Sequence, residues 1–332
     1  MNVGIAIRHP EHVKLYRHAA THLVERGHDV SLYVRDYRET TDLLTEYGLP
    51  HTTLAGEPTS QRDLLTGHLR YEAKLYRQAR RDDVDVLTSV GGRSVSHIAP
   101  LVGARSVVFV DWEPTRVDDL VARLSDAVCT PSYLDADLRG KQIVYDGLHE
   151  LAYLHPQRFR PEFETLDVDV DSSAPIFVLG VADVDDASSW LTSVAEYLAT
   201  RGRVYLSDAS DDAAERTLDV AGRLSPESVH TTLSQADLCV SDLSTLATEA
   251  AVLGTPAVHV HSDPPGRCRY LEREYGLLTN TDPRNGTRDV VAQAVTDDDR
   301  PRRTRARREQ LLTDMGDTTD TIVRTILSEG AR

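Results

Sequence analysis

Short apolar runs alternate with stretches of helical periodicity along most of the chain. In the first half, runs typical of buried strands occupy residues 3–8, 29–34, 51–55, 84–90, 105–110, 126–130 and 142–146. Amphipathic stretches that favour helices lie between them, at 11–26, 38–47, 59–81, 94–102 and 115–124. Because strands that alternate with helices form βαβ units, this half predicts a parallel sheet covered by helices. Three of these helices are followed by a glycine suited to a left-handed C-terminal cap, namely Gly27, Gly48 and Gly103.

The alternation stops between residues 145 and 175, where prolines and alternating aspartates replace any clear period. It resumes with predicted strands at 176–181, 203–207, 236–241 and 256–260. Helices are predicted at 187–200 and 210–222, after residue 241, and in the charged tail. We therefore expect an α/β protein with two Rossmann-like domains, 1–148 and 175–332, joined by a connection over 149–174. Two such halves leave an interdomain cleft, and open parallel sheets bind ligands beyond the carboxyl ends of their strands.

The composition excludes several classes of protein. Hydrophobic residues make up 40% of the 332 residues, which is too many for a disordered chain. No window approaches the roughly 18 apolar residues of a transmembrane helix, and the N-terminus resembles a first strand more than a signal peptide. We therefore expect a cytoplasmic protein without a transmembrane segment. The widely spaced Cys129, Cys239 and Cys268 fit neither a disulfide framework nor a zinc site, and we expect the first two to be small buried residues.

The chain is strongly acidic, with 53 acidic and 37 basic residues and a formal net charge of −16. This charge argues against nucleic acid as a partner, because binding to phosphates requires an excess of cations. Lysine is nearly absent, occurring only at Lys14, Lys74 and Lys141. An acidic, lysine-poor surface favours adaptation to high salt, where self-repulsion is screened. The alternative is an ordinary acidic protein from a GC-rich genome that prefers arginine to lysine. The oligomeric state is left open.

The stretch SDLSTLATEAAVLGTPAVHV, residues 241–260, joins two predicted strands through a short helix. With Asp242 as N-cap, apolar residues form one stripe of this helix, and Thr245 and Glu249 share the other face. A helix N-terminus offers free N–H groups and a partial positive charge to a phosphate. A carboxylate one turn further along can accept hydrogen bonds from ribose hydroxyls. The alternative is a capped helix that exposes one glutamate.

Residues 236–260 resemble the nucleotide-binding unit of GT-B-fold glycosyltransferases and of the non-hydrolysing UDP-N-acetylglucosamine 2-epimerases. More closely, the chain resembles an archaeal and bacterial family of GT-B-like proteins of unknown function. The features of that family appear in order over roughly residues 1–280, as HPEHVKLYRHAATHLVERGHDVSLYVRD, LLTEYGLPHTTLAG, VFVDWEP, YDGLHELAYLHP and the 236–260 unit. The resemblance implies the GT-B fold and does not specify a reaction.

The resemblance implies that the second domain binds a nucleotide sugar, expected to be UDP-linked, as substrate, with no other cofactor. The nucleotide-binding residues that it indicates are Ser241, Asp242, Ser244, Thr245 and Glu249. It favours glycosyl transfer in the interdomain cleft, with inversion or retention left open and a sugar, lipid or protein as acceptor. The alternatives are an epimerase-like reaction and a nucleotide-sugar-binding or scaffolding protein that has lost catalysis.

Two departures from the family pattern favour the non-catalytic alternative. The glycine pair of the family is absent from the helix start, where Leu243, Ser244 and Thr245 stand. Side chains there can obstruct a diphosphate, although the two hydroxyls can donate hydrogen bonds instead. In addition, the strand 176–181 is not followed by the arginine or histidine that relatives often place near phosphate.

Two loops of the first half hold candidate residues for the sugar or the acceptor. His9 and His12 follow the first strand, and His9 could donate a proton or bind a sugar hydroxyl. The alternative is a histidine on a surface loop. Gly91, Gly92 and Arg93 lie between a strand and a helix, where their N–H groups and positive charge could hold an anion or acceptor. A paired-glycine turn is the alternative there.

Carboxylates and histidines follow two further strands. Asp111 and Glu113 flank Trp112 after the strand 105–110, and Asp111 is the candidate general base, with Glu113 as a sugar ligand. The alternative is that these carboxylates cap the next helix. His261 is a further candidate sugar ligand. No metal site is expected, because His259 and His261 lack a second ligand pair at standard spacing.

We predict that folding requires high salt, because the excess acidic charge repels itself over a Debye length of about 30 Å at 0.01 M and about 3 Å at 1 M. The thermal midpoint of unfolding should rise steeply from low to molar potassium chloride. Circular dichroism melts over that range check this prediction, and a midpoint that stays flat or falls would contradict the salt-adapted interpretation.

Overall fold

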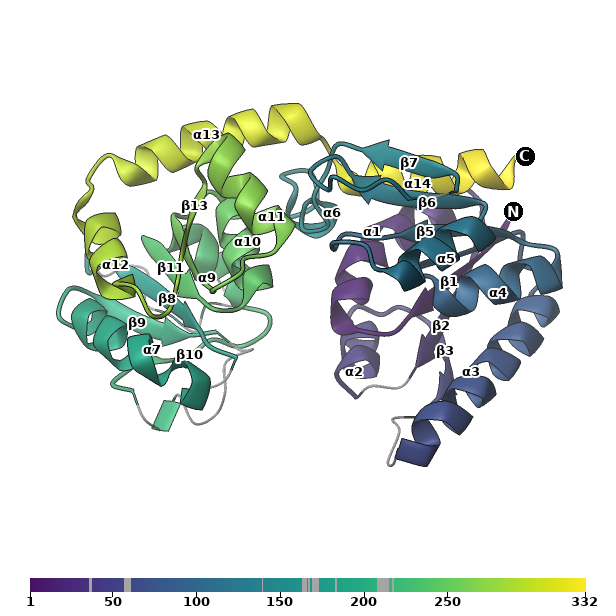
Figure 1. Cartoon of the computed structure of the whole chain (residues 1–332), viewed down its shortest axis with the longest axis horizontal. Coiled ribbons are helices and arrows are strands. Elements are labelled where there is room, and N and C mark those ends of the chain that lie inside the picture. Colours follow the sequence, from purple (N-terminus) through teal and green to yellow (C-terminus); the bar gives the residue numbers. More distant parts are fainter. Residues whose placement is uncertain are drawn as a thin grey trace. The chain divides into compact units, whose positions relative to one another are not determined.

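The computed structural model covers residues 1–332 and describes all of them except 36–37, 57–60, 139, 163–165, 167, 169–172, 183, 208–214 and 217. The chain divides into two compact units, each with its own sheet (Figure 1). The first unit combines Met1–Tyr153 with Gly316–Arg332, and the second is Leu154–Met315. The expected second domain, 175–332, therefore differs from the observed unit at both ends, and most of the expected connection 149–174 belongs to that unit.

The sheet of the first unit contains the seven strands predicted from the apolar runs. They are β1 (Asn2–Ile7), β2 (Asp29–Arg35), β3 (His51–Ala55), β4 (Val86–Val90), β5 (Arg105–Phe109), β6 (Ala127–Pro131) and β7 (Gln142–Tyr145). All paired strands are parallel, in the order β3-β2-β1-β4-β5-β6-β7. The order of the strands along the chain reverses between β1 and β4, so the loops that follow these two strands diverge to opposite faces of the sheet.

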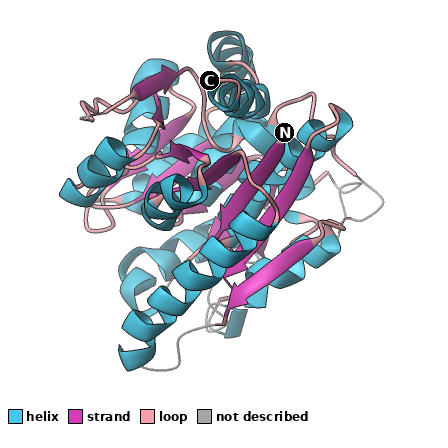
Figure 2. Cartoon of the chain, turned by 90° about the vertical axis from the view of Figure 1, so that its right-hand side faces the viewer, coloured by secondary structure: helices cyan, strands magenta, loops and turns pink. Residues whose placement is uncertain are grey.

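Helices cover both faces of this sheet (Figure 2). One face packs against α1 (Pro10–Glu25), α2 (Arg38–Glu46) and α14 (Thr318–Gly330). The other packs against α3 (Gln61–Arg81), α4 (Arg93–Val102) and α5 (Arg116–Leu124). A short helix, α6 (Leu151–Leu154), follows β7. The predicted glycine caps are confirmed, because Gly27, Gly48 and Gly103 have φ of +81°, +64° and +80°.

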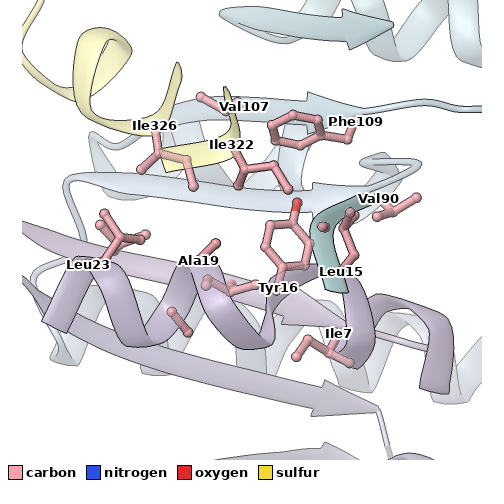
Figure 3. Close-up of a cluster of buried hydrophobic side chains, with 14 of the residues drawn as sticks. Ile7, Leu15, Tyr16, Ala19, Leu23, Val90, Val107, Phe109, Ile322 and Ile326 are labelled. Atoms are coloured by element: carbon pink, nitrogen blue, oxygen red, sulfur yellow. The ribbon is translucent and has the colours of Figure 1, made fainter. Parts of the chain in front are cut away.

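The helix α14 belongs to the first unit, which corrects the expectation that it belongs to the second domain; the preceding helix α13 does belong to the second unit. Its Ile322 and Ile326 lie in the same buried cluster as Tyr16 and Phe109 (Figure 3). Two hydroxyls at its start anchor it to the end of the N-terminal segment. Thr318 Oγ1 donates to the carbonyl of Leu148, and Thr319 Oγ1 donates to that of Ala152, each at 2.7 Å.

The second unit holds a six-stranded parallel sheet in the order β10-β9-β8-β11-β12-β13. Its strands are β8 (Ile176–Gly180), β9 (Arg203–Leu206), β10 (Gly222–Arg223), β11 (Leu238–Ser241), β12 (Ala257–Val260) and β13 (Leu278–Thr281). The sequence predicted four of them and missed β10 and β13, which are short edge strands. The helix predicted at 210–222 is wrong at its C-terminal end: residues 215–216 are helical, but residues 218–221 are not and Gly222 begins β10, while 210–214 and 217 lie outside the described residues.

The helices of the second unit are α7 (Val184–Ala199), α9 (Val229–Gln235), α10 (Ser244–Leu253), α11 (Gly266–Tyr270), the π-helical η2 (Leu271–Tyr275), α12 (Thr287–Thr296) and α13 (Arg300–Met315). The core between the sheet and α7 and α12 includes Trp190, Val240 and Val291. Among the described helices, none is long and apolar enough to span a membrane. The cysteines Cys129 and Cys239 are buried as expected, and so is Cys268.

Candidate functional site

In the second unit, the order of the strands reverses between β8 and β11, and Asp242 joins the loops that follow them. Its Oδ1 accepts a hydrogen bond of 2.8 Å from the N–H of Ala182, just after β8. Asp242 is therefore not the N-cap of α10, which corrects the sequence analysis. The N-cap is Leu243, and no side chain caps the helix. Ser241 Oγ accepts from Leu243 N at 2.9 Å and so holds the loop that leads into α10.

A cation lies at the start of α10. Arg267, on α11, places its Nη2 at 2.9 Å from Ser244 Oγ and 3.3 Å from Thr245 Oγ1. Arg267 was not predicted from the sequence, because relatives place the basic residue after the strand that corresponds to β8. The available signal was an arginine directly after the Pro-Pro-Gly turn that follows β12. Charged guanidinium, two hydroxyls and the uncapped N–H groups of a helix together form a surface suited to a phosphate group.

Glu249 is not on an outer face of α10 as the sequence analysis expected. It is only 3% exposed, and its Oε1 lies 3.1 Å from Nε2 of His230 on the neighbouring helix α9. The ring of Phe159 meets the imidazole of His230 edge-on, with ring centres 6.1 Å apart. The helix stripe was misjudged because α9 covers the side of α10 that the sequence left to solvent. Its contact with ribose stays a prediction.

Two histidines at the end of β12 and after it are stacked on one another. The rings of His259 and His261 lie 5.6 Å apart at an interplanar angle of 8°. His259 is fully buried, with Nδ1 at 2.9 Å from Oδ1 of Asn280, and burial lowers its pKa. His261 is exposed, and its Nδ1 accepts from the N–H of Asp263 at 3.0 Å. Within the described residues, no group of three or more His, Cys, Asp or Glu side chains is placed to hold a metal ion.

In the first unit, His9 and His12 stand at the start of α1, directly after β1. His9 is the exposed N-cap residue of that helix, and its ring meets the ring of His12 edge-on at 5.3 Å. The Nδ1 of His12 accepts from the N–H of Arg8 at 3.4 Å. Burial, with the nearby His9, His149 and Arg8, lowers the pKa of His12 to about 3. His12 is therefore a neutral imidazole near pH 7.

The glycines after β4 are required by the backbone and by packing. Gly91 and Gly92 have φ of +75° and +58°, in the left-handed region that favours glycine. A Cβ on Gly92 would lie 2.3 Å from the side chain of Val108, and one on Gly91 would lie 3.0 Å from the indole of Trp112. Arg93 is the exposed first residue of α4. Their role in binding an acceptor stays a prediction.

Asp111 is held in place from two neighbouring strands. Its Oδ2 lies 3.2 Å from Nδ1 of His149, after β7, and its carbonyl accepts from Tyr133 Oη, after β6, at 3.2 Å. Both carboxylate and imidazole are largely buried, with 15% and 13% of their side chains exposed. The sequence analysis missed His149, although it lies within the family-like motif YDGLHELAYLHP.

Neither Asp111 nor Glu113 caps α5, so the structural alternative for these carboxylates is wrong. Thr115 is the N-cap, and it forms a capping box with Asp118. The indole Nε1 of Trp112 donates to the same Asp118 carboxylate at 3.3 Å. Glu113 is exposed.

The predicted site residues therefore form two sets, one in each unit. His9, Gly91 and Asp111 follow the adjacent strands β1, β4 and β5, so they share the carboxyl edge of the first sheet. In the second unit, Asp242 and His261 follow the adjacent strands β11 and β12 at the carboxyl edge of that sheet. Ligands of open parallel sheets bind at these edges, where the strand order reverses.

Comparison with solved structures identifies the fold. The chain is similar to a spinosyn forosaminyltransferase (TM-score 0.72, 14% identity, covering 98% of this chain and 99% of that one). It is also similar to the glycosyltransferase VinC, solved in complex with DTDP (TM-score 0.71, 13% identity, covering all of both chains). A third similar structure is a putative UDP-N-acetylglucosamine 2-epimerase from Listeria monocytogenes (TM-score 0.75, 10% identity, covering 97% of this chain and 94% of that one).

The chain has the GT-B fold. The resemblance to GT-B glycosyltransferases and 2-epimerases that the sequence motifs suggested is confirmed at the level of fold. No protein-family model matches the chain, and no curated protein sequence matches it significantly. At these low sequence identities the similarity establishes the fold and not the reaction. The reaction has to be inferred from the side chains at the carboxyl edges of the two sheets.

His12 should give the stability of the protein a pH dependence. Its pKa of about 3 when folded lies below its ordinary value of 6.5, so between these values the unfolded chain binds a proton that the folded chain does not. Stability should therefore fall as the pH decreases below 6.5, by up to about 1.4 kcal/mol per pH unit from this group. The free energy of unfolding, measured with urea at several pH values between 4 and 7, should depend less steeply on pH in His12→Asn than in the wild type. An equal pH dependence of stability in the two proteins would contradict a lowered pKa of His12.

Proposed function

We propose that this protein is a glycosyltransferase that uses a nucleotide sugar, UDP-linked, in the cytoplasm. The observation that carries the proposal is the contact of Arg267 with Ser244 and Thr245 at the uncapped start of α10. This cation supplies what the sequence analysis found missing after β8. It removes one of the two arguments for a protein that has lost catalysis. The GT-B fold and the nucleotide bound by VinC support the same assignment.

The second unit binds the nucleotide in this proposal. The diphosphate lies at the N-terminus of α10, where Arg267 neutralises its charge and the hydroxyls of Ser244 and Thr245 donate to its oxygens. Because negative charge grows on the diphosphate as it leaves, the same groups stabilise the transition state. Glu249 accepts from the ribose hydroxyls, with His230 orienting its carboxylate. Asp242 and Ser241 hold the loop that presents the helix.

The first unit supplies the base and the sugar contacts. Asp111 takes the proton of the acceptor hydroxyl as that oxygen bonds to the anomeric carbon and the bond to the diphosphate breaks. His149 fixes the carboxylate at 3.2 Å and stabilises its charge. His9 positions the sugar. The remaining candidates for contact with sugar or acceptor are His12, Gly91, Gly92, Arg93, Glu113 and His261.

A 2-epimerase-like reaction is the second candidate. The Listeria epimerase has a TM-score of 0.75, slightly above that of the transferases. An epimerase would convert a nucleotide sugar without any acceptor, so product analysis with the nucleotide sugar alone distinguishes the two reactions.

Arg267→Gln should weaken the binding of UDP or TDP. The lost charge-assisted hydrogen bonds should cost roughly 1.5–3 kcal/mol, which is about tenfold or more in Kd. Calorimetry in molar potassium chloride measures this. The matched control is Arg269→Gln, because Arg269 lies on the same helix and pairs with the exposed Asp263 at 3.3 Å. If the Arg267 variant and the wild type bind the nucleotide with equal affinity, the diphosphate does not bind at this site.

Asp111→Asn should lower turnover by about 10²–10⁴-fold, because a positioned general base contributes that much to rate. Nucleotide affinity should stay nearly unchanged, since the nucleotide is bound by the other unit. His9→Ala should reduce turnover less. Asp42→Asn, at an exposed position of α2, is the control. A wild-type rate in the Asp111 variant, measured on nucleotide sugars by product analysis, would end its assignment as the base.

A further inference from the structure

Arg35, the last residue of β2, is a buried cation. Only 5% of it is exposed, and its Nε is fully buried without a hydrogen-bond partner. No carboxylate among the described residues pairs with its guanidinium. Burying an unpaired charge is strongly unfavourable, so this group calls for a partner that the described residues do not supply.

A second arginine lies at the same edge of the sheet. Ile7 pairs with Val34 in the β1–β2 register, so Arg8 and Arg35 stand next to each other at the carboxyl ends of two adjacent strands. The guanidinium of Arg35 extends toward α3, because a Cβ on Gly67 would lie 3.8 Å from its Nη2. The side chain of Arg8 has no hydrogen bond or ion pair within the described part of the chain.

One turn after Gly67, α3 carries a buried hydroxyl at Tyr71. Tyr71 is 1% exposed, and its Oη has no hydrogen-bond partner within the described residues. Burial raises the pKa of Tyr71 to about 12, while the positive charges of Arg8 and Arg35 act in the opposite direction. The phenol therefore keeps its proton and can donate it in a hydrogen bond. Two cations and one donor thus lie in the same region of the first unit, and no described acceptor bonds to Arg35 Nε or Tyr71 Oη.

Glu72, the residue of α3 that follows Tyr71, contacts other side chains. Glu72 Oε1 lies 3.1 Å from Nε2 of His68 and 3.4 Å from Nδ1 of His97. It faces these two imidazoles and does not neutralise Arg35. Glu72 therefore leaves the positive charges of Arg8 and Arg35 unbalanced, in a chain whose net charge is −16.

We propose that Arg35, Arg8 and the Tyr71 hydroxyl bind an oxyanion, a carboxylate or a phosphate, carried by the sugar or the acceptor. The planar guanidinium groups match such an anion in geometry, and the phenol donates a third hydrogen bond. The identity of the ligand as sugar or acceptor rests on the proposed function, whereas oxyanion binding at these residues can be tested without it. The site lies wholly within the first unit.

The test uses inorganic phosphate and glucuronate as probes on the full chain, with ionic strength held constant by potassium chloride. Thermal melts and calorimetry compare wild type with Arg35→Met and Tyr71→Phe. Arg77→Met, an exposed position of the same helix α3, is the control for loss of one positive charge. Arg267→Gln separates this site from the proposed diphosphate site.

We expect at least one probe to raise the thermal midpoint of the wild type. Arg35→Met should lower the affinity for that probe by about tenfold or more, and Tyr71→Phe should lower it by about fivefold. Arg77→Met and Arg267→Gln should retain its binding. Without a probe, Arg35→Met should melt at or above the wild-type temperature, because it removes an unpaired buried charge. Binding of phosphate alone would indicate a phosphorylated ligand, and binding of glucuronate alone a carboxylate.

Two outcomes would overturn the proposal. One is that neither probe stabilises the wild type. The other is that Arg35→Met keeps full probe affinity and melts below the wild type, as expected if Arg35 only supported the fold. A nucleotide affinity that is unaffected by Arg267→Gln would reject the proposed function and leave the oxyanion site in place.

Discussion

Every paired strand in this molecule is parallel to its neighbour, and the two sheets depend on this constraint. Parallel strands require a crossover between them, which places helices on the faces and directs all carboxyl ends to one edge. The loops at that edge are free of a role in pairing, so they can carry polar chemistry. This is why residues as distant in sequence as His9, Asp111 and His149 lie at one edge of a single sheet.

The sequence predicted the parts of the fold that arise from local pattern. All seven strands of the first sheet were predicted, and the central strands β4, β5 and β6 are mostly apolar, as strands buried on both faces usually are. β13 was missed because its residues, LTNT, are polar after the first leucine and so form no apolar run. The position of α14 was missed because periodicity shows that a helix has a buried stripe and does not show which core buries it. Ile322 and Ile326 fit either core by composition.

The candidate site was predictable where a loop follows a strand and was not where contacts are long-range. Asp111 and His9 were predicted because they follow strands directly in the sequence. The roles of His149 and Arg267 depend on contacts between segments that are distant in the sequence. Glu249 shows the same limit, because its burial comes from α9, which carries His230. Charge partners of this kind are properties of the packed structure, so a single sequence without its fold does not reveal them.

The anchoring of α14 has a consequence for biosynthesis. Because Thr318 and Thr319 bond to carbonyls near the end of the first segment, and Ile322 completes the core around Tyr16, the first unit cannot close until this helix has left the ribosome. While the second unit is translated, α1 and α2 can cover this face of the sheet, but the apolar surface that α14 buries stays exposed. Nascent chains in that state are open to aggregation and to chaperone capture. The second unit, contiguous in sequence, can fold first.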